Sequence, residues 1–133
     1  MEAIKKFFER DQFAARNGIE LVEVAPGYAK VRMAVQPHHW NGIGSTHGGA
    51  LFTLGDFAFA VACNSHGTVA VAISANISFM KATSKGTLTG EAREVSKNHR
   101  LGTYLVEIKD ETGELVALFQ GLAYRKGDPL PLQ

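Results

Sequence analysis

A polar, glycine-rich segment runs directly into an apolar one, and together they read Asn41-Gly42-Ile43-Gly44-Ser45-Thr46-His47-Gly48-Gly49-Ala50-Leu51-Phe52-Thr53-Leu54-Gly55-Asp56-Phe57-Ala58-Phe59-Ala60-Val61-Ala62-Cys63. Ser45 and Thr46 are good N-cap residues, because their side-chain oxygens can accept the free N–H groups of a first helical turn. After them, apolar residues recur with helical spacing at Leu51, Leu54, Ala58 and Ala62. The pattern predicts a loop followed by a helix with one buried stripe.

One acidic residue interrupts the apolar part of this helix. Asp56 shares a second helix face with Phe52, Phe59 and Cys63, so a carboxylate stands among bulky apolar groups. An ionisable group in such a place costs roughly several kcal/mol unless it is paired or used. Asp56 is therefore a candidate for chemistry.

Length and composition indicate one ordinary globular domain over residues 1–133, with a core at about 19–126. The chain has 133 residues, of which 45% are hydrophobic and 20% charged, and a formal net charge of +1. That charge offers no argument for nucleic acid or an acidic membrane surface. The lone cysteine, Cys63, and the lack of an apolar signal segment favour a reducing compartment, with the cytoplasm as the default. No apolar run is long enough to predict a membrane span.

The remaining segments predict one further helix and six strands. Residues 2–16 read as an amphipathic helix ending near Asn17-Gly18, and residues 19–24 and 30–36 are expected to form a hairpin through a turn at 25–28. Strands are expected at 69–80, 86–97, 101–110 and 114–125, followed by a loose tail. The order is that of an α+β fold with an antiparallel sheet.

The strand at 69–80 and the central helix suggest how the layers meet. Strict alternation places small residues on one side of this strand, among them Ala72 and Ser74, against which a neighbour could pack closely, so both faces could be covered. Gly55, Ala58 and Ala62 give the helix a narrow waist around which the sheet can curl. One large sheet with so little helix leaves a face uncovered, which suggests oligomerisation.

The order of elements, and the motif Asn41-x5-His47-Gly48-Gly49-x6-Asp56 together with Val116-Ala117-Leu118-Phe119-Gln120-Gly121, resemble the hotdog-fold acyl-CoA thioesterases. More narrowly, they resemble the phenylacetate-degradation (PaaI-type) branch. The resemblance implies one long central helix wrapped by a curved, antiparallel six-stranded sheet. It also implies hydrolysis of an acyl-CoA without metal or organic cofactor, in homodimers that pair into homotetramers.

Gly48 and Asp56 are the expected catalytic residues. The first N–H groups of a helix are free donors, so the Gly48 N–H can polarise a thioester carbonyl, and Gly49 keeps the approach clear. Asp56 would act as nucleophile or as general base on water, which the residues leave open. Eight residues of helix separate the two by about 12 Å, so they can cooperate only across a twofold axis between two subunits.

Further residues are expected to bind substrate. Asn41 and His47 match family loop residues, an amide that can orient the thioester or water and a histidine that helps fix the loop. Where related enzymes place a Ser or Thr to hold water, this chain has Ala72, and Ser74 is expected to face the same side and substitute. Arg100 is the first candidate for CoA phosphates among the strand-end cations Lys81, Lys85, Lys97, His99, Arg100 and Lys126.

Phe52 and Phe59 are expected to line an apolar acyl pocket, with help from Trp40 and Ile43. This favours aryl-acetyl or medium-chain acyl groups over acetyl. If Phe59 instead faces the sheet, the pocket is shorter.

Two other classes remain open. Hotdog folds also serve acyl-CoA hydratases and dehydratases, which need a histidine near the acyl α-carbon. A non-catalytic acyl-CoA binding module would keep the pocket without the chemistry.

Overall fold

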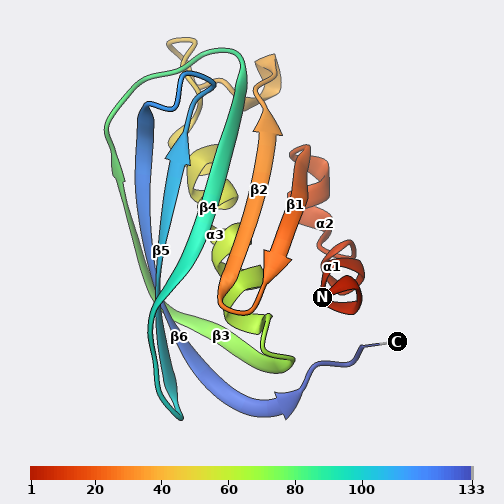
Figure 1. Ribbon diagram of the computed structural model, residues 1–133. Helices are drawn as coiled ribbons and strands as arrows, with labels where there is room; N and C mark the ends of the chain where they lie inside the picture. The colour runs from red at the N-terminus through yellow and green to blue at the C-terminus, as the bar shows by residue number, and fades with distance from the viewer. Residues whose placement is uncertain (133) are drawn as a thin grey trace.

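The computed structural model describes residues 1–132 and contains one six-stranded antiparallel sheet curved around a central helix (Figure 1). The sheet order is β1-β2-β4-β5-β6-β3, so β1 and β3 are the edge strands. Its strands are β1 (Ile19–Ala25), β2 (Tyr28–Ala34), β3 (Thr68–Phe79), β4 (Thr87–Lys97), β5 (Leu101–Lys109) and β6 (Leu115–Pro129). The expected α+β hotdog architecture is confirmed.

The central helix α3 (Gly48–Asn64) fits against the sheet at small residues. A β-carbon on Gly55 would lie 2.9 Å from the ring of Phe119, and one on Gly121 would lie 2.6 Å from the ring of Phe59. Ala58 and Ala62 are fully buried as well. The narrow waist predicted for this helix is therefore present, and it lets helix and sheet approach closely.

The N-terminal segment forms two short helices in place of the single one expected over 2–16. They are α1 (Glu2–Phe8) and α2 (Gln12–Arg16), and they lie beside β1 and α3 (Figure 1). The chain turns between them because the Asp11 carboxylate accepts the Ala14 N–H at 3.0 Å, which starts a new helix. The turn at 25–28 is as predicted, with Gly27 at φ +72°.

Residues 127–131 of the C-terminal tail are held in place, contrary to the prediction of a loose end after Lys126. Strand β6 continues to Pro129, which pairs with Thr68, and the Leu130 N–H donates to the Gly67 carbonyl at 2.9 Å. Leu130 is buried, and this apolar anchor explains why the tail is held.

Strand β3 does not alternate throughout, which corrects the predicted division of its faces. Its pairing with β6 shifts between Ala72, opposite Ala123, and Ser74, opposite Leu122, so Ile73 is the extra residue of a β-bulge. The bulge exchanges the two faces, and most of β3 is exposed on both sides in the single chain.

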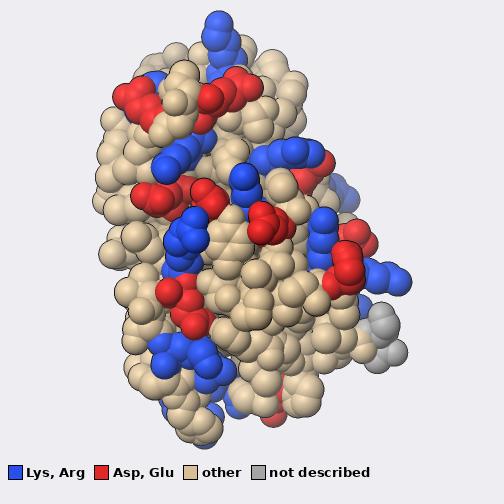
Figure 2. Space-filling model, viewed as in Figure 1, with Lys and Arg blue, Asp and Glu red and all other residues tan. Residues whose placement is uncertain are grey.

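Surface charge on the sheet face seen in Figure 2 is mixed, with Lys and Arg interleaved with Asp and Glu. Within residues 1–132, no helix combines the length and apolarity needed to cross a membrane.

Candidate functional site

The N-cap of α3 is His47, whereas the sequence favoured Ser45 or Thr46. The His47 Nδ1 accepts the Gly49 N–H at 2.8 Å. The Thr46 hydroxyl does not cap the helix, because it donates a hydrogen bond to the Thr83 carbonyl oxygen at 3.0 Å. An imidazole that accepts at Nδ1 is neutral and carries its proton on Nε2.

This cap separates the roles of the two glycines. The Gly49 N–H is occupied by His47, and the Gly48 N–H has no hydrogen-bond acceptor among residues 1–132. A β-carbon on Gly49 would lie 3.0 Å from the His47 Nδ1, so Gly49 lets the imidazole reach the backbone. Gly48 is thus left as a free donor at the positive end of a 17-residue helix.

Asn41 lines one cavity together with Gly48, and hydrogen bonds within its own loop hold its side chain. Its side-chain oxygen accepts the Ile43 N–H at 3.0 Å and the Ser45 N–H at 3.1 Å. The amide orientation follows from these two donors. The oxygen is therefore occupied, while the two amide N–H donors have no partner among residues 1–132 and could bind a carbonyl or a water.

The cavity that contains Asn41 and Gly48 has a volume of about 420 Å³ and an apolar wall. Leu51 comes from α3, Phe79 ends β3, and Met80 directly follows that strand. The Phe79 ring lies over Gly48, because a β-carbon there would be 3.1 Å from its edge. This wall is one that the sequence analysis did not identify, since Phe79 was read only as part of an alternating strand.

Asp56 is partly buried and lies outside this cavity. Burial raises the pKa of its carboxyl group above the ordinary value, and the negative charge of Asp11 adds to the effect. Asp11 was not singled out from the sequence, because the contact between α2 and α3 is tertiary. A carboxylate with a raised pKa is a stronger base than an ordinary one.

The helix face that carries Asp56 differs in part from the predicted one. Phe59 and Cys63 point into the core, and burial raises the pKa of the Cys63 thiol to about 12. Five residues that are not buried recur along one side of α3 and form what we call the open stripe, namely Gly49, Phe52, Thr53, Asp56 and Ala60. Because α3 is one continuous helix, Asp56 lies about 12 Å along its axis from Gly48.

The two expected pocket aromatics are separated. Phe52 lies on the open stripe, with its ring centroid 5.1 Å from that of Phe119. Phe59 is 1% exposed and packs edge-on against Tyr104 in the core, which is the alternative the sequence left open for it. Phe59 therefore does not line a cavity in the single chain.

The sequence analysis expected Ser74 to face the same side of the sheet as Ala72, and this expectation is wrong. The β-bulge at Ile73 aligns Ala72 with the buried Ala123 and Ser74 with Leu122, so the two side chains lie on opposite faces of the sheet. Ser74 opens onto an outer-face cavity with Asn76. The helix-facing side at this level is occupied by alanine.

Some of the strand-end cations already contact other side chains of the same chain. Lys81 contacts Asp110 at 2.5 Å and Glu114 at 2.7 Å, so it is paired with acids. Arg100 is exposed and lies over the Tyr124 ring, 5.9 Å from its centroid. Arg100 is at the far end of β6 from the Gly48 cavity of the same chain, because Tyr124 pairs with Val71 and Ala117 with Phe79.

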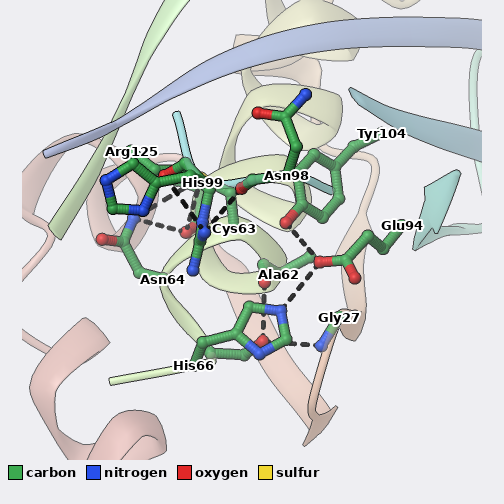
Figure 3. Close-up of polar contacts among 12 residues, drawn as sticks. Gly27, Ala62, Cys63, Asn64, His66, Glu94, Asn98, His99, Tyr104 and Arg125 are labelled. Atoms are coloured by element: carbon green, nitrogen blue, oxygen red, sulfur yellow. Dashed lines mark hydrogen bonds and ion pairs between the residues drawn. The ribbon is translucent and has the colours of Figure 1, made fainter. Parts of the chain in front are cut away.

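A second polar cluster lies at the other end of α3 (Figure 3). Glu94 accepts hydrogen bonds from the Tyr104 hydroxyl at 2.6 Å and from the His66 Nε2 at 2.7 Å. Nearby, the Ser65 hydroxyl accepts the Gly27 N–H at 2.7 Å. These contacts tie the end of α3 to β4 and to the first hairpin.

Comparison with known proteins gives one consistent assignment. Residues 43–117 match the model of the thioesterase superfamily. The chain is 39% identical to a putative esterase of Archaeoglobus fulgidus, over 98% of this chain and 86% of that protein. It is 40% identical to the acyl-coenzyme A thioesterase PaaI of Escherichia coli, over 90% of this chain and 86% of that protein.

Solved structures agree with this assignment. The E. coli PaaI protein from the phenylacetic acid degradation operon superposes with a TM-score of 0.92 and 37% identity, covering 96% of this chain and 94% of that one. A hypothetical thioesterase from Streptococcus pneumoniae, solved with coenzyme A, superposes with a TM-score of 0.86 and 25% identity, covering 94% of this chain and 98% of that one. The matched family segment includes Gly48, Asp56 and the whole of α3. The chain belongs to the thioesterase superfamily.

Proposed function

We propose that this protein hydrolyses acyl-CoA thioesters to a free acid and CoA. The observation that carries the proposal is the free Gly48 N–H at the start of α3, beside the unpaired amide donors of Asn41 in one cavity. Membership of the thioesterase superfamily and likeness to the acyl-coenzyme A thioesterase PaaI supply the reaction class.

On the electrophile side, the Gly48 N–H donates to the thioester carbonyl oxygen. Negative charge grows on that oxygen as the carbonyl carbon becomes tetrahedral, and a donor fixed at a helix N-terminus stabilises it without reorganising. The Asn41 amide donates to the same oxygen or holds the attacking water. His47 supports both by fixing the first turn, since its Nδ1 is committed to the Gly49 N–H.

On the nucleophile side, Asp56 either attacks the carbonyl carbon directly, which expels the CoA thiolate and leaves a mixed anhydride that water hydrolyses, or removes a proton from an attacking water, after which the tetrahedral intermediate expels the CoA thiolate. Either role requires the ionised carboxylate, and partial burial makes that carboxylate more basic. A reacting group must come within about 3 Å of the carbon, so an Asp56 about 12 Å from Gly48 on the same helix cannot serve it. The acid for each site comes from a second subunit.

Two features of the single chain support such a homodimer. The open stripe of α3 leaves Asp56 partly exposed in the single chain. Strand β3 is an edge strand with exposed apolar side chains, including Ile73 at 56% and Phe79 at 56%. A twofold axis beside β3 would bury this edge and bring two antiparallel α3 helices together, giving two equivalent sites. We further propose that dimers pair into homotetramers through the remaining uncovered sheet face.

The acyl group we expect is aryl-acetyl or medium-chain. The wall beside Gly48 is apolar, formed by Leu51, Phe79 and Met80, with Ile43 at its rim. Phe52 from the open stripe of the second subunit would extend it. The lone thiol, Cys63, is buried in the core, which suits a cytoplasmic protein.

The decisive experiment measures release of free thiol from a panel of acyl-CoAs by the purified protein. Turnover with a saturated acyl-CoA supports the proposal. An absorbance change with an enoyl-CoA, without thiol release, would assign a hydratase and overturn it. Saturable binding of acyl-CoA without either signal would assign a binding module. The capping role of His47 speaks against the hydratase, because one nitrogen of its ring is already engaged.

A further inference from the structure

His39 is buried at 2% exposure in the loop before α3, and both of its ring nitrogens are engaged. Nδ1 accepts the Gln36 N–H at 2.9 Å, and Nε2 lies 2.8 Å from the Asn17 carbonyl oxygen. A carbonyl oxygen can only accept, so Nε2 carries the proton and the ring is neutral. Neither bond belongs to the chemistry proposed above.

These contacts join two segments that are distant in the sequence. Asn17 is the C-cap of α2, in the N-terminal segment. His39 closes the 3₁₀ turn η1 (Pro37–His39), and its own carbonyl oxygen accepts the His47 N–H at 2.7 Å. His47 in turn caps Gly49. An unbroken series of polar contacts therefore runs from α2 to the first turn of α3.

The space around this series is not filled by packing. A cavity of about 390 Å³ lies between α2, η1 and α3, lined by Asn17, His39, His47, Gly49 and Thr53, among others. A loop that borders an open cavity has fewer van der Waals contacts on that side, so directional hydrogen bonds contribute more to fixing its backbone. His39 is the one side chain of this lining that bonds both η1 and α2.

We infer that His39 is a positioning residue, which fixes the His47 backbone and through it the direction of the free Gly48 N–H. The inference rests on the proposed function, since the Gly48 N–H matters only if it binds a reacting carbonyl. His39 does not touch the substrate. A donor displaced by about 1 Å from the developing oxyanion can cost on the order of 100-fold in rate. The Gln36 and Asn17 bonds together prevent that displacement.

The test uses two variants and one matched control. His39→Phe keeps the ring volume and removes both bonds, whereas His39→Asn keeps an acceptor near the Nδ1 position for the Gln36 N–H. The control is His38→Phe, because His38 is exposed and its side chain makes no hydrogen bond within residues 1–132, although its ring packs against His39 at a tilt of 51° with centroids 4.1 Å apart. It alters the same turn and leaves the series intact.

Three quantities are measured on each protein: kcat and KM for the best acyl-CoA, the melting temperature, and the amide ¹H–¹⁵N resonances of Gly48 and Gly49. For His39→Phe we expect kcat to fall at least about tenfold with KM nearly unchanged, and both glycine amides to shift. His39→Asn should recover part of kcat, and His38→Phe should match the parent. A purely structural role would lower the melting temperature and leave kcat per folded site unchanged, which would overturn the inference.

The amide resonances separate this inference from the proposed function. If the parent releases no thiol yet His39→Phe shifts the Gly48 amide, the function fails and the positioning stands. If the parent is active and the Gly48 amide does not move, the positioning is wrong. Should His39→Phe fail to fold, the imidazole ¹⁵N shifts of the parent and the kinetics of His39→Asn decide. An Nε2–H tautomer in the parent, together with a lower kcat in His39→Asn, would support the inference. A proton on Nδ1 in the parent would contradict it.

Discussion

The Nδ1 of His47 accepts the Gly49 N–H at 2.8 Å, and the neighbouring Gly48 N–H is left without an acceptor among residues 1–132. A histidine cap thus uses one of two adjacent glycine donors and frees the other. If Thr46 were the N-cap, Gly48 would be N2, a position whose N–H the capping side chain can accept, so the position of the cap at His47 leaves the Gly48 N–H free.

Removing the Asp56 carboxylate should abolish most turnover. For both Asp56→Ala and Asp56→Asn we expect kcat to fall by about 100-fold or more, since a general base or nucleophile contributes roughly that much. The fold should persist, because Asp56 is only partly buried on the open stripe. Steady-state kinetics with circular dichroism of the same samples checks this. Activity within a few-fold of the parent in both variants would remove Asp56 from the chemistry.

The Asp11 charge should raise the pH below which activity is lost. Burial and then Asp11 raise the pKa of Asp56, and the base works only when ionised, so activity falls as the pH drops through that raised pKa. Asp11→Asn removes the charge but keeps an acceptor for the Ala14 N–H, so α2 stays capped. The acid limb of kcat/KM should therefore move to lower pH.

The control for this shift is Glu9→Gln, which removes a carboxylate from the same connection between α1 and α2. Its profile should overlay that of the parent, since Glu9 is not among the causes of the Asp56 pKa. An acid limb that stays in place, or moves to higher pH, in Asp11→Asn would show that the two carboxylates do not interact.

The shared site can be tested by subunit mixing. Gly48→Val places a branched side chain against the Phe79 ring, where a β-carbon alone would be 3.1 Å away, and blocks the carbonyl site. Each single variant should be inactive. Mixed dimers of Asp56→Ala with Gly48→Val should regain part of the parent activity, because one of the two sites then has both an intact Gly48 and an intact Asp56. Dimers verified as mixed that remain inactive would contradict a cross-subunit site, and mixing Asp56→Ala with Asp56→Asn is the negative control.

The Glu94 cluster should make stability depend on acid pH. Burial alone would raise the pKa of Glu94, but hydrogen bonds from Tyr104 and His66 outweigh it and lower the pKa below 4.5. The stabilisation is therefore complete above 4.5 and is lost as the pH falls through the lowered value. At neutral pH, Glu94→Gln should lower the free energy of unfolding by about 1–3 kcal/mol.

Urea unfolding of parent and Glu94→Gln at several pH values measures this difference. It should narrow on acidification below pH 4.5, where only the parent takes up the proton. The control is Glu107→Gln, whose carboxylate has only a long contact of 3.9 Å with Lys109 and is well exposed. A difference that stays constant with pH would mean that the Glu94 charge contributes nothing.

The sequence predicted the fold well because its signals are local. The helical spacing from Leu51 to Ala62 and the turn at Gly27 depend on nearby residues, and both have the expected structure. The β-bulge at Ile73 was missed, because the residues around it alternate perfectly and the extra residue is decided by pairing with β6. The contact of His39 with Asn17 and the electrostatic effect of Asp11 on Asp56 were missed for the same reason, since each joins separate segments.

Acyl selectivity follows from the wall beside Gly48. Leu51, Phe79 and Met80 present apolar surface in a cavity of about 420 Å³, which an acetyl group would leave mostly empty. Burying apolar surface contributes about 25 cal/mol per Å², so a phenyl ring could add a few kcal/mol of binding energy, part of it available in the transition state. We therefore expect kcat/KM to rise from acetyl- to hexanoyl- and phenylacetyl-CoA.

Measuring kcat/KM for these three substrates and 3-hydroxyphenylacetyl-CoA on one preparation tests that order, and Phe79→Ala identifies the wall. The variant should lose more activity with phenylacetyl-CoA than with acetyl-CoA, because a phenyl ring buries much more apolar surface against the Phe79 side chain than a methyl group does. Since Phe59 lies in the core, Phe59→Leu should not alter the ratio between the two substrates, and it serves as the control. Equal or better turnover of acetyl-CoA by the parent would rule out the apolar acyl pocket while leaving thioester hydrolysis intact, because the Gly48 donor acts on the carbonyl whatever chain it carries.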